Sequence, residues 1–211
     1  MMETKAVIFD LLTALLDSWS LWDATAGNEP LGRRWRARYL ELTYACGAYR
    51  PYEELVAEAA ADAELPSSAP GVLRANWGNL KPWPEVPGVL ARLLAEGFRL
   101  GVVTNCSTEL GGLAATRCGI SFDAVVTAEE VGFYKPRPEP YRAVLAALNV
   151  AAGEALFVAG SSADVAGAAG AGMPVVWHNR VGLAPRPGPK PLCEAGTLDA
   201  ALENFLRPAS A

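Results

Sequence analysis

The chain has 211 residues, of which 51% are hydrophobic and 19% are charged, and its formal net charge is −5. This length accommodates one core domain with an insert, and the apolar content is enough for a sizeable core. The acidic balance, without a block of basic residues, argues against a nucleic-acid-binding protein. No run of 18 or more apolar residues occurs, so we expect no helix that spans a membrane.

The first predicted element is a buried strand that ends on a carboxylate. Residues 6–9 are four consecutive apolar residues, a pattern typical of a strand inside a parallel sheet, and Asp10 follows them. A charge at the end of a buried strand is costly unless a partner compensates it. The carboxyl ends of strands in an open α/β sheet face the ligand crevice. Asp10 is therefore the first candidate for chemistry, the alternative being an ordinary acidic residue at a strand end.

The next segment, from Ser18 to about Leu80, is helical in pattern and poor in strand signals. Its prolines divide it into about four helices, and within it Trp35–Tyr44 has the apolar spacing of an amphipathic helix. The segment is too long for a loop inside a compact domain. We therefore expect a helical cap over residues 16–83, inserted into a core made of residues 1–15 and 84–211.

Beyond the cap, apolar runs alternate with helical patterns. We expect strands over 98–104, 124–127, 155–159 and 174–178, and helices over about 84–96, 107–117, 138–148 and 163–171. This alternation predicts an α/β fold with a Rossmann-like, doubly wound parallel sheet and helices on both faces. A loop rich in Pro and Gly over 182–191 and a last helix over about 198–206 complete the chain.

Polar residues follow two more of these strands, and a lysine lies between them. Thr104–Asn105 ends one strand, Ser161–Ser162 follows another, and Lys135 lies within the stiff segment Tyr134–Pro138. A carboxylate can attack carbon or phosphorus and form a covalent ester or acyl phosphate, and a neighbouring ammonium would keep Asp10 ionised. The Thr104 hydroxyl and nearby backbone N–H groups would form an anion site. The alternatives are a surface lysine and a threonine that caps its own turn.

The four cysteines are widely separated, without a CxxC pair: Cys46, Cys106, Cys118 and Cys193. This usage favours free thiols and a cytoplasmic location. The strand that starts at Ala6 leaves no room for a signal peptide before it, and we expect none. The only histidine, His178, cannot form a zinc site with such scattered thiols.

Taken in chain order, Asp10, Thr104, Lys135 and Asp164 resemble the four-motif signature of the haloacid dehalogenase superfamily. The resemblance spans nearly the whole chain. It implies a Rossmann-like core with a cap, Asp10 as a catalytic nucleophile, and Asp164 as the residue that orients Lys135. An acidic residue at a helix start could also simply favour the helix dipole, so both roles of Asp164 stay open.

Two departures from the superfamily pattern disfavour its magnesium-dependent phosphatases. Those enzymes carry a second Asp two residues after the nucleophile, where this chain has Leu12, and another in the fourth motif, where it has Gly160. Magnesium needs hard oxygen ligands, usually carboxylates, and Asp10 with Asp164 alone makes a poor set. We therefore expect activity without a metal or another cofactor.

Other residues resemble the 2-haloacid dehalogenase branch, which needs no metal. Trp35–Arg36 resembles the Trp–Arg pair of its cap, whose Arg helps to hold the leaving halide, and Tyr141 matches a tyrosine six residues after the lysine. The resemblance implies substrate-binding roles for five residues: Arg36, Asn105, Tyr141, Leu11 and Trp35. The alternative for the arginines around position 36 is one solvated helix face.

Three positions of this branch are changed. Ala14 stands where the branch has threonine, although Thr13 lies beside it, and Ala159 replaces a serine. Ser161 replaces an asparagine near the hydrolytic water, and it or Ser162 could still hold that water. The favoured function is halide displacement by Asp10 from a short carboxylic acid, followed by hydrolysis of the aspartyl ester. The alternatives are a phosphatase with a rebuilt metal site and a binding protein without catalysis; a homodimer also stays open.

Overall fold

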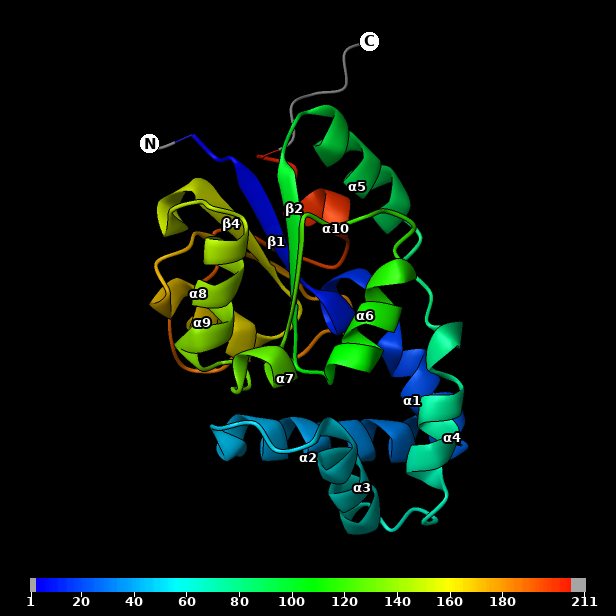
Figure 1. Cartoon of the computed structure of the whole chain (residues 1–211). Helices are drawn as coiled ribbons and strands as arrows, with labels where there is room; N and C mark the ends of the chain where they lie inside the picture. The colour runs from blue at the N-terminus through cyan, green and yellow to red at the C-terminus, as the bar shows by residue number, and fades with distance from the viewer. Residues whose placement is uncertain (1–2, 206–211) are drawn as a thin grey trace.

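The computed structural model describes residues 3–205, and its core is a parallel sheet (Figure 1). Within these residues the sheet has six strands in the order β3-β2-β1-β4-β5-β6. The strands are β1 (Ala6–Asp10), β2 (Arg99–Thr104), β3 (Ala124–Thr127), β4 (Ala155–Ala159), β5 (Val175–His178) and β6 (Glu194–Ala195). In the central strand, Ala6 is in register with Arg99 on one side and with Ala155 on the other. The predicted α/β class with a doubly wound parallel sheet is confirmed.

Helices cover both faces of this sheet. They are α5 (Val86–Ala95), α6 (Thr108–Thr116), α7 (Ala128–Val131), α8 (Pro138–Ala147), α9 (Ser162–Gly170) and α10 (Leu198–Ala201). Along β1, Val7 and Phe9 join the hydrophobic cluster that contains residues of α5, α6 and α10, whereas Ala6 and Ile8 join the cluster of α8 and α9. Burial on both faces explains why this strand is a continuous apolar run.

The segment between β1 and α5 forms helices that lie beyond the carboxyl ends of the strands (Figure 1). They are α1 (Ser18–Ala26), α2 (Glu29–Cys46), α3 (Tyr52–Asp62), α4 (Ala69–Ala75) and a short 3-10 helix, η2 (Trp77–Asn79). Pro30 lies in the first turn of α2, where a missing N–H costs nothing. The helices thus cover the edge of the sheet where Asp10 ends its strand.

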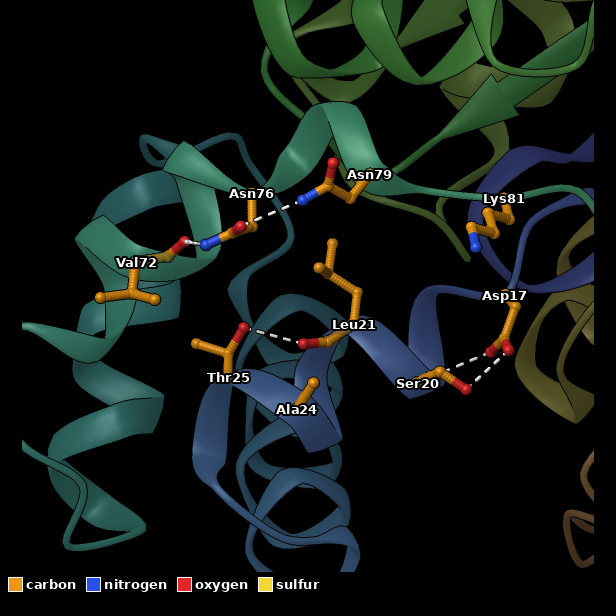
Figure 2. Close-up of a pocket in the computed structure, with 9 residues that line it drawn as sticks. All are labelled: Asp17, Ser20, Leu21, Ala24, Thr25, Val72, Asn76, Asn79 and Lys81. Atoms are coloured by element: carbon orange, nitrogen blue, oxygen red, sulfur yellow. Dashed lines mark hydrogen bonds between the residues drawn. The ribbon is translucent and has the colours of Figure 1, made fainter.

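The two connections between the helices and the sheet run side by side. Leu16 forms an antiparallel bridge with Pro82, and the backbone N of Asp17 donates to the carbonyl oxygen of Lys81 at 2.8 Å. Asp17 also caps α1, because its carboxylate accepts from the backbone N and the hydroxyl of Ser20, beside a groove between α1 and α4 (Figure 2). On these contacts we propose residues 16–83 as the cap and 1–15 with 84–211 as the core.

The structure also differs from the sequence prediction at a few elements. The strand β6 and the helix α7 were not predicted, and α10 ends at Ala201, although a helix to about residue 206 was expected. Residue 206 itself lies outside the described residues. Leu11–Leu15, directly after β1, form a single π-helical turn, η1. Within residues 3–205, no helix has the length and apolar character needed to cross a membrane.

Candidate active site

Asp10 ends β1 and is held by the turn that follows it. One carboxylate oxygen, Oδ2, accepts hydrogen bonds from the backbone N of Thr13 at 2.8 Å and of Ala14 at 3.2 Å, and the Thr13 hydroxyl donates to the same oxygen. Isolated π-turns of this kind are frequent at functional sites. Asp10 is only 6% exposed, so these hydrogen bonds hold its carboxylate in a site that is largely shielded from solvent. Thr13 therefore supplies the hydroxyl that Ala14 lacks.

Lys135 bridges two carboxylates. Its Nζ lies 2.7 Å from Oδ1 of Asp10 and 2.9 Å from Oδ1 of Asp164. Its backbone is held by the amide of Asn105, which accepts from the N of Lys135 at 2.7 Å and donates to its carbonyl oxygen at 3.1 Å. The predicted proximity of these motifs is thus realised as one buried charge cluster, and Asn105 positions the lysine.

Asp164 lies in the first turn of α9, surrounded by hydroxyl groups. The Ser161 hydroxyl accepts from the backbone N of Asp164 at 3.3 Å and donates to its Oδ2 at 3.2 Å. The hydroxyl of Tyr141 donates to Oδ1 at 3.0 Å. Tyr141 can approach so closely because residue 167 is glycine: a Cβ there would lie 2.5 Å from the tyrosine oxygen. Tyr141, which was predicted to bind substrate, instead forms a hydrogen bond with Asp164.

The charged groups of Asp10, Lys135 and Asp164 shift one another's pKa values. Burial raises the pKa of Asp10, but the Lys135 charge and the hydrogen bonds from Lys135 and Thr13 outweigh it, so the pKa lies below its ordinary value. Burial lowers the pKa of Lys135, yet the two carboxylates raise it overall. Burial raises the pKa of Asp164, and Lys135 offsets this only in part. Asp10 is therefore the more readily ionised carboxylate, as a nucleophile must be.

A cavity of about 40 Å³ opens in front of Asp10. The core side of its lining contains the residues of the predicted motifs, namely Asp10, Thr104, Asn105, Lys135, Ser161 and Asp164. The cap side comes from α1 and α2, with Trp19, Arg36, Tyr39, Leu40 and Tyr44. The Thr104 hydroxyl is buried and has no hydrogen-bond partner among the described residues, so it is free to contact a ligand.

Arg36 brings a buried positive charge into this cavity from the cap. It is 2% exposed, and its Nε and Nη1 have no hydrogen-bond partner within residues 3–205. The guanidinium carbon lies 4.3 Å from the centre of the Trp19 ring. Burial lowers the pKa of Arg36, but an arginine stays charged in proteins. A buried guanidinium with free donors is suited to an anion.

The other arginines of α2 are paired elsewhere. Arg33 contacts Asp23 and Glu29, Arg34 contacts Glu64, and Arg38 contacts Glu41 and Asp62. Successive residues of a helix differ by about 100° in direction, so Arg34 and Arg38 point away from the side of Arg36, whereas Arg33 lies near that side and its guanidinium carbon is 4.8 Å from the centre of the Trp19 ring. The structure places the guanidinium of Arg36 there and those of the other three outside it.

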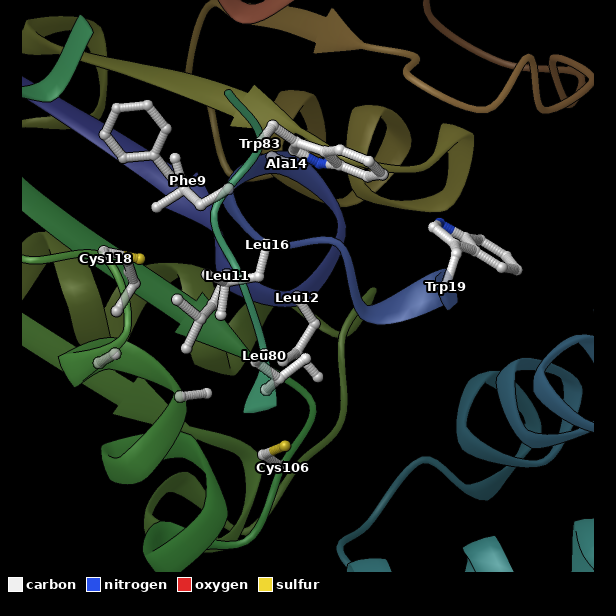
Figure 3. Close-up of a cluster of buried hydrophobic side chains, with 14 of the residues drawn as sticks. Phe9, Leu11, Leu12, Ala14, Leu16, Trp19, Leu80, Trp83, Cys106 and Cys118 are labelled. Atoms are coloured by element: carbon white, nitrogen blue, oxygen red, sulfur yellow. The ribbon is translucent and has the colours of Figure 1, made fainter. Parts of the chain in front are cut away.

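Besides Tyr141, two more of the residues predicted to bind substrate have side chains outside the cavity. Trp35 is fully buried within the cap, where its Nε1 donates to the carbonyl oxygen of Val56 at 2.9 Å. Leu11 packs into the hydrophobic cluster between sheet and cap (Figure 3). Trp35 directly precedes Arg36 and therefore points to another side of α2. The aromatic ring that contacts Arg36 in the cavity is that of Trp19.

Sequence reasoning missed several cavity residues. Arg36, Leu40 and Tyr44 are spaced by four and share one face of α2, and this spacing could have identified the last two. The Tyr44 hydroxyl lies 3.4 Å from that of Ser161, so it joins the polar group around Asp164. Leu183 lies in the loop before β6, and no pattern in the sequence marked it.

The residues present do not fit a magnesium site. A Cβ at Gly160 would lie 1.9 Å from the Thr13 hydroxyl and 2.7 Å from the backbone N of Ala14, so no side chain can stand there beside Thr13. Lys135 occupies the space between the two remaining carboxylates. Within residues 3–205, no group of three or more His, Cys, Asp or Glu side chains is placed to hold a metal ion. Metal independence stays a prediction.

Known proteins resemble this chain along most of its length. The family model for haloacid dehalogenase-like hydrolase matches residues 4–172. Haloacetate dehalogenase H-2 of Moraxella sp. (strain B) is 30% identical, with 87% of this chain and 89% of the relative covered. (S)-2-haloacid dehalogenase 1 of Pseudomonas sp. (strain CBS-3) is 29% identical, with 84% and 85% covered. A crystal structure of an L-2-haloacid dehalogenase superposes with a TM-score of 0.87 at 27% identity, covering 98% and 100% of the two chains. The chain belongs to the haloacid dehalogenase-like hydrolase family.

Proposed function

We propose that the protein is a metal-independent 2-haloacid dehalogenase with Asp10 as its nucleophile. One observation carries this proposal: a single cavity holds the Asp10 carboxylate, paired with Lys135, and the buried guanidinium of Arg36, whose Nε and Nη1 have no hydrogen-bond partner within residues 3–205. The first group can displace a halide, and the second can receive an anion. Relatives that are named as haloacetate and (S)-2-haloacid dehalogenases support the same function.

In the first step, Asp10 attacks the carbon that bears the halogen. A bond forms between a carboxylate oxygen and C2 of the acid, and the halide leaves with the electron pair of the broken bond. Arg36, stacked on the Trp19 ring, stabilises a negative charge, either on the departing halide or on the substrate carboxylate. The free hydroxyl of Thr104 supplies a donor on the opposite, core side of the cavity.

In the second step, water hydrolyses the aspartyl ester. Water attacks the carbonyl carbon of the Asp10 side chain, Lys135 stabilises the negative charge on its oxygen, and Asp164 accepts a proton from the water. The bond between that carbon and the oxygen attached to C2 then breaks, and the departing alkoxide takes up the proton. The Ser161 hydroxyl, between Asp164 and Tyr44, would orient that water. The products are a 2-hydroxy acid, a proton and regenerated Asp10. Because the cavity is only about 40 Å³, the shortest halo acids should fit best.

A halide-release assay over short 2-halo acids, with and without EDTA, tests this function. We expect chloride release from chloroacetate and 2-chloropropionate, at a rate that prior treatment with EDTA leaves unchanged, because the two carboxylates contact Lys135 and form no cage for a metal. Release of phosphate from phosphate esters that requires magnesium would favour the phosphatase alternative. Saturable binding of halo acids without any turnover would favour a binding protein.

The ionisation of Asp10 predicts the pH dependence of the first step. Because Lys135 and its hydrogen bonds hold the pKa of Asp10 below the ordinary value of 3.8, kcat/KM should stay constant as the pH falls from neutrality toward that value. In Lys135→Gln the burial of Asp10 is no longer opposed by a charge, so the acid limb should move to higher pH. Circular dichroism at each pH verifies the fold. An unshifted limb in this variant would contradict the pairing.

The cytoplasmic location and the homodimer stay predictions, which cell fractionation and light scattering would check. The four cysteines are free thiols in the structure, in keeping with a reducing compartment.

A further inference from the structure

Two aromatic side chains contact the backbone carbonyl groups of the turn that follows Asp10. Trp83 donates from Nε1 to the carbonyl oxygen of Thr13 at 3.2 Å, and Nδ1 of His178 lies 2.7 Å from the carbonyl oxygen of Ala14. The same turn donates its Thr13 and Ala14 N–H groups to Asp10. One side of each residue therefore faces the nucleophile, and the other faces an indole or imidazole.

The contact of Trp83 reaches Asp10 through a single peptide unit. The carbonyl of Thr13 and the N–H of Ala14 belong to the same peptide, so a donor on the first polarises the second toward Oδ2 of Asp10. Trp83 also donates from its backbone N to the carbonyl oxygen of Leu15 at 3.0 Å. Figure 3 shows its ring beside Ala14, over the turn. Trp83 thus holds this turn at two points.

His178, the last residue of β5, fixes the next peptide. The imidazole is completely buried, and Nδ1 carries the proton because a carbonyl oxygen can only accept. Its Nε2 lies 3.5 Å from Oε1 of Glu85, and this oxygen accepts hydrogen bonds from Arg180 at 3.2 Å and from the backbone N of Leu198 at 3.1 Å. The ring is therefore held in one orientation by the core.

We propose that Trp83 and His178 are positioning residues, which hold the Thr13–Ala14 backbone so that its N–H groups orient Asp10 for attack. The proposal rests on the proposed function, because it concerns the rate of the step that Asp10 performs. Neither side chain lines the cavity, so substrate binding should not depend on them. A misplacement of a reacting group by about 1 Å can cost on the order of 10²-fold in rate. Loss of either donor should therefore lower kcat and leave KM nearly unchanged.

The first test compares two tryptophans. Trp83→Phe keeps an aromatic ring but removes the donor to Thr13, and we expect kcat for chloroacetate to fall about tenfold with KM within twofold of wild type. Trp77→Phe is the matched control, because Trp77 is also buried and its Nε1 donates to the carbonyl oxygen of Leu110 at 2.9 Å, away from the cavity. Equal kcat values in the two variants would overturn the role of Trp83.

The second test moves the donor at position 178. The amide nitrogen of Asn reaches the place of Nδ1, whereas that of Gln reaches the place of Nε2. We expect His178→Asn to recover most of the kcat that His178→Gln loses, about tenfold, with KM unchanged in both. Equal losses in the two variants, or a loss expressed in KM, would overturn the positioning role of His178.

A third measurement needs no variant. The chain contains one histidine, so its side-chain nitrogen signals are unambiguous in ¹⁵N-labelled protein. We expect a neutral ring with the proton on Nδ1, since burial lowers the pKa of His178. A proton on Nε2 alone would overturn the contact with Ala14, even if His178→Gln does not fold. Wild-type protein that releases no halide would instead contradict the proposed function, and the nitrogen signals would still decide this contact.

Discussion

Replacing Asp10 with Asn is expected to abolish halide release. A neutral amide is not a nucleophile toward C2 of a halo acid, and it offers Lys135 no opposite charge. We expect turnover to fall at least about 10⁴-fold, as when a residue that forms the covalent bond is removed. Lys135 keeps its contact with Asp164 at 2.9 Å, so the charge is not left unpaired and the fold should persist. Halide release, circular dichroism and the intact mass of fresh protein check this result.

The matched control for that variant is Asp17→Asn. Asp17 also accepts N–H and O–H donors at the start of a helix, from the backbone and hydroxyl of Ser20, but it lies outside the cavity. Its replacement should leave turnover near the wild-type value. A wild-type rate in Asp10→Asn, with deamidation excluded by mass, would contradict the nucleophile. Wild-type protein quenched during turnover should carry an added mass equal to the substrate less hydrogen halide on the peptide that contains Asp10.

Arg36→Lys is expected to lower turnover on the order of 10²-fold. The lysine keeps a positive charge but loses the planar set of donors and the stacking on Trp19, where the guanidinium carbon lies 4.3 Å from the ring centre. The loss of one donor that acts in the transition state has about this magnitude. If Arg36 holds the departing halide, kcat falls; if it holds the substrate carboxylate, KM rises as well. Steady-state kinetics with chloroacetate and bromoacetate separate the two.

The matched control is Arg38→Lys, two residues further along the same helix. The Arg38 side chain is 40% exposed and pairs with Asp62 at 2.7 Å and Glu41 at 3.0 Å, and surface pairs of this kind contribute little to stability. We expect its kinetics to match those of wild type. If the two variants behave alike, the assignment of Arg36 to the anion is wrong, and the arginines of α2 serve only as a solvated face.

The core strands could be predicted because each is a short apolar run bounded by polar residues. The expected ranges 124–127 and 155–159 match β3 and β4, since burial on both faces demands continuous apolar sequence. Strand β6 could not be found, because it consists of two residues, Glu194–Ala195, held only by its pairing with β5. Tertiary contact, and not local sequence, makes it a strand.

The polar part of the candidate site could be predicted for a different reason. Asp10 and Thr104 are the last residues of β1 and β2, and Ser161 lies just after β4. The carboxyl ends of parallel strands lie at the same edge of the sheet, so these residues come together. The apolar part of the site could not be predicted. Trp35 was predicted to bind substrate because it is adjacent to Arg36, but the side chains of adjacent helix residues point in different directions. Trp19 and Leu183 reach the cavity from distant segments, and their placement depends on how the cap and the last loop pack.

The contact between Gly160 and Thr13 has a consequence for how this sequence can change. A mutation that introduces a carboxylate at position 160 would place its Cβ 1.9 Å from the Thr13 hydroxyl and 2.7 Å from the backbone N of Ala14, so it requires at least a smaller residue at position 13. That second change removes a donor from Asp10. A smaller residue at position 13 does not clear the backbone N of Ala14, which would still lie 2.7 Å from the new Cβ, so the turn itself must also move. No single substitution therefore converts this site into a metal-dependent one, because the side chain at position 13 and the backbone of the turn have to change together with position 160.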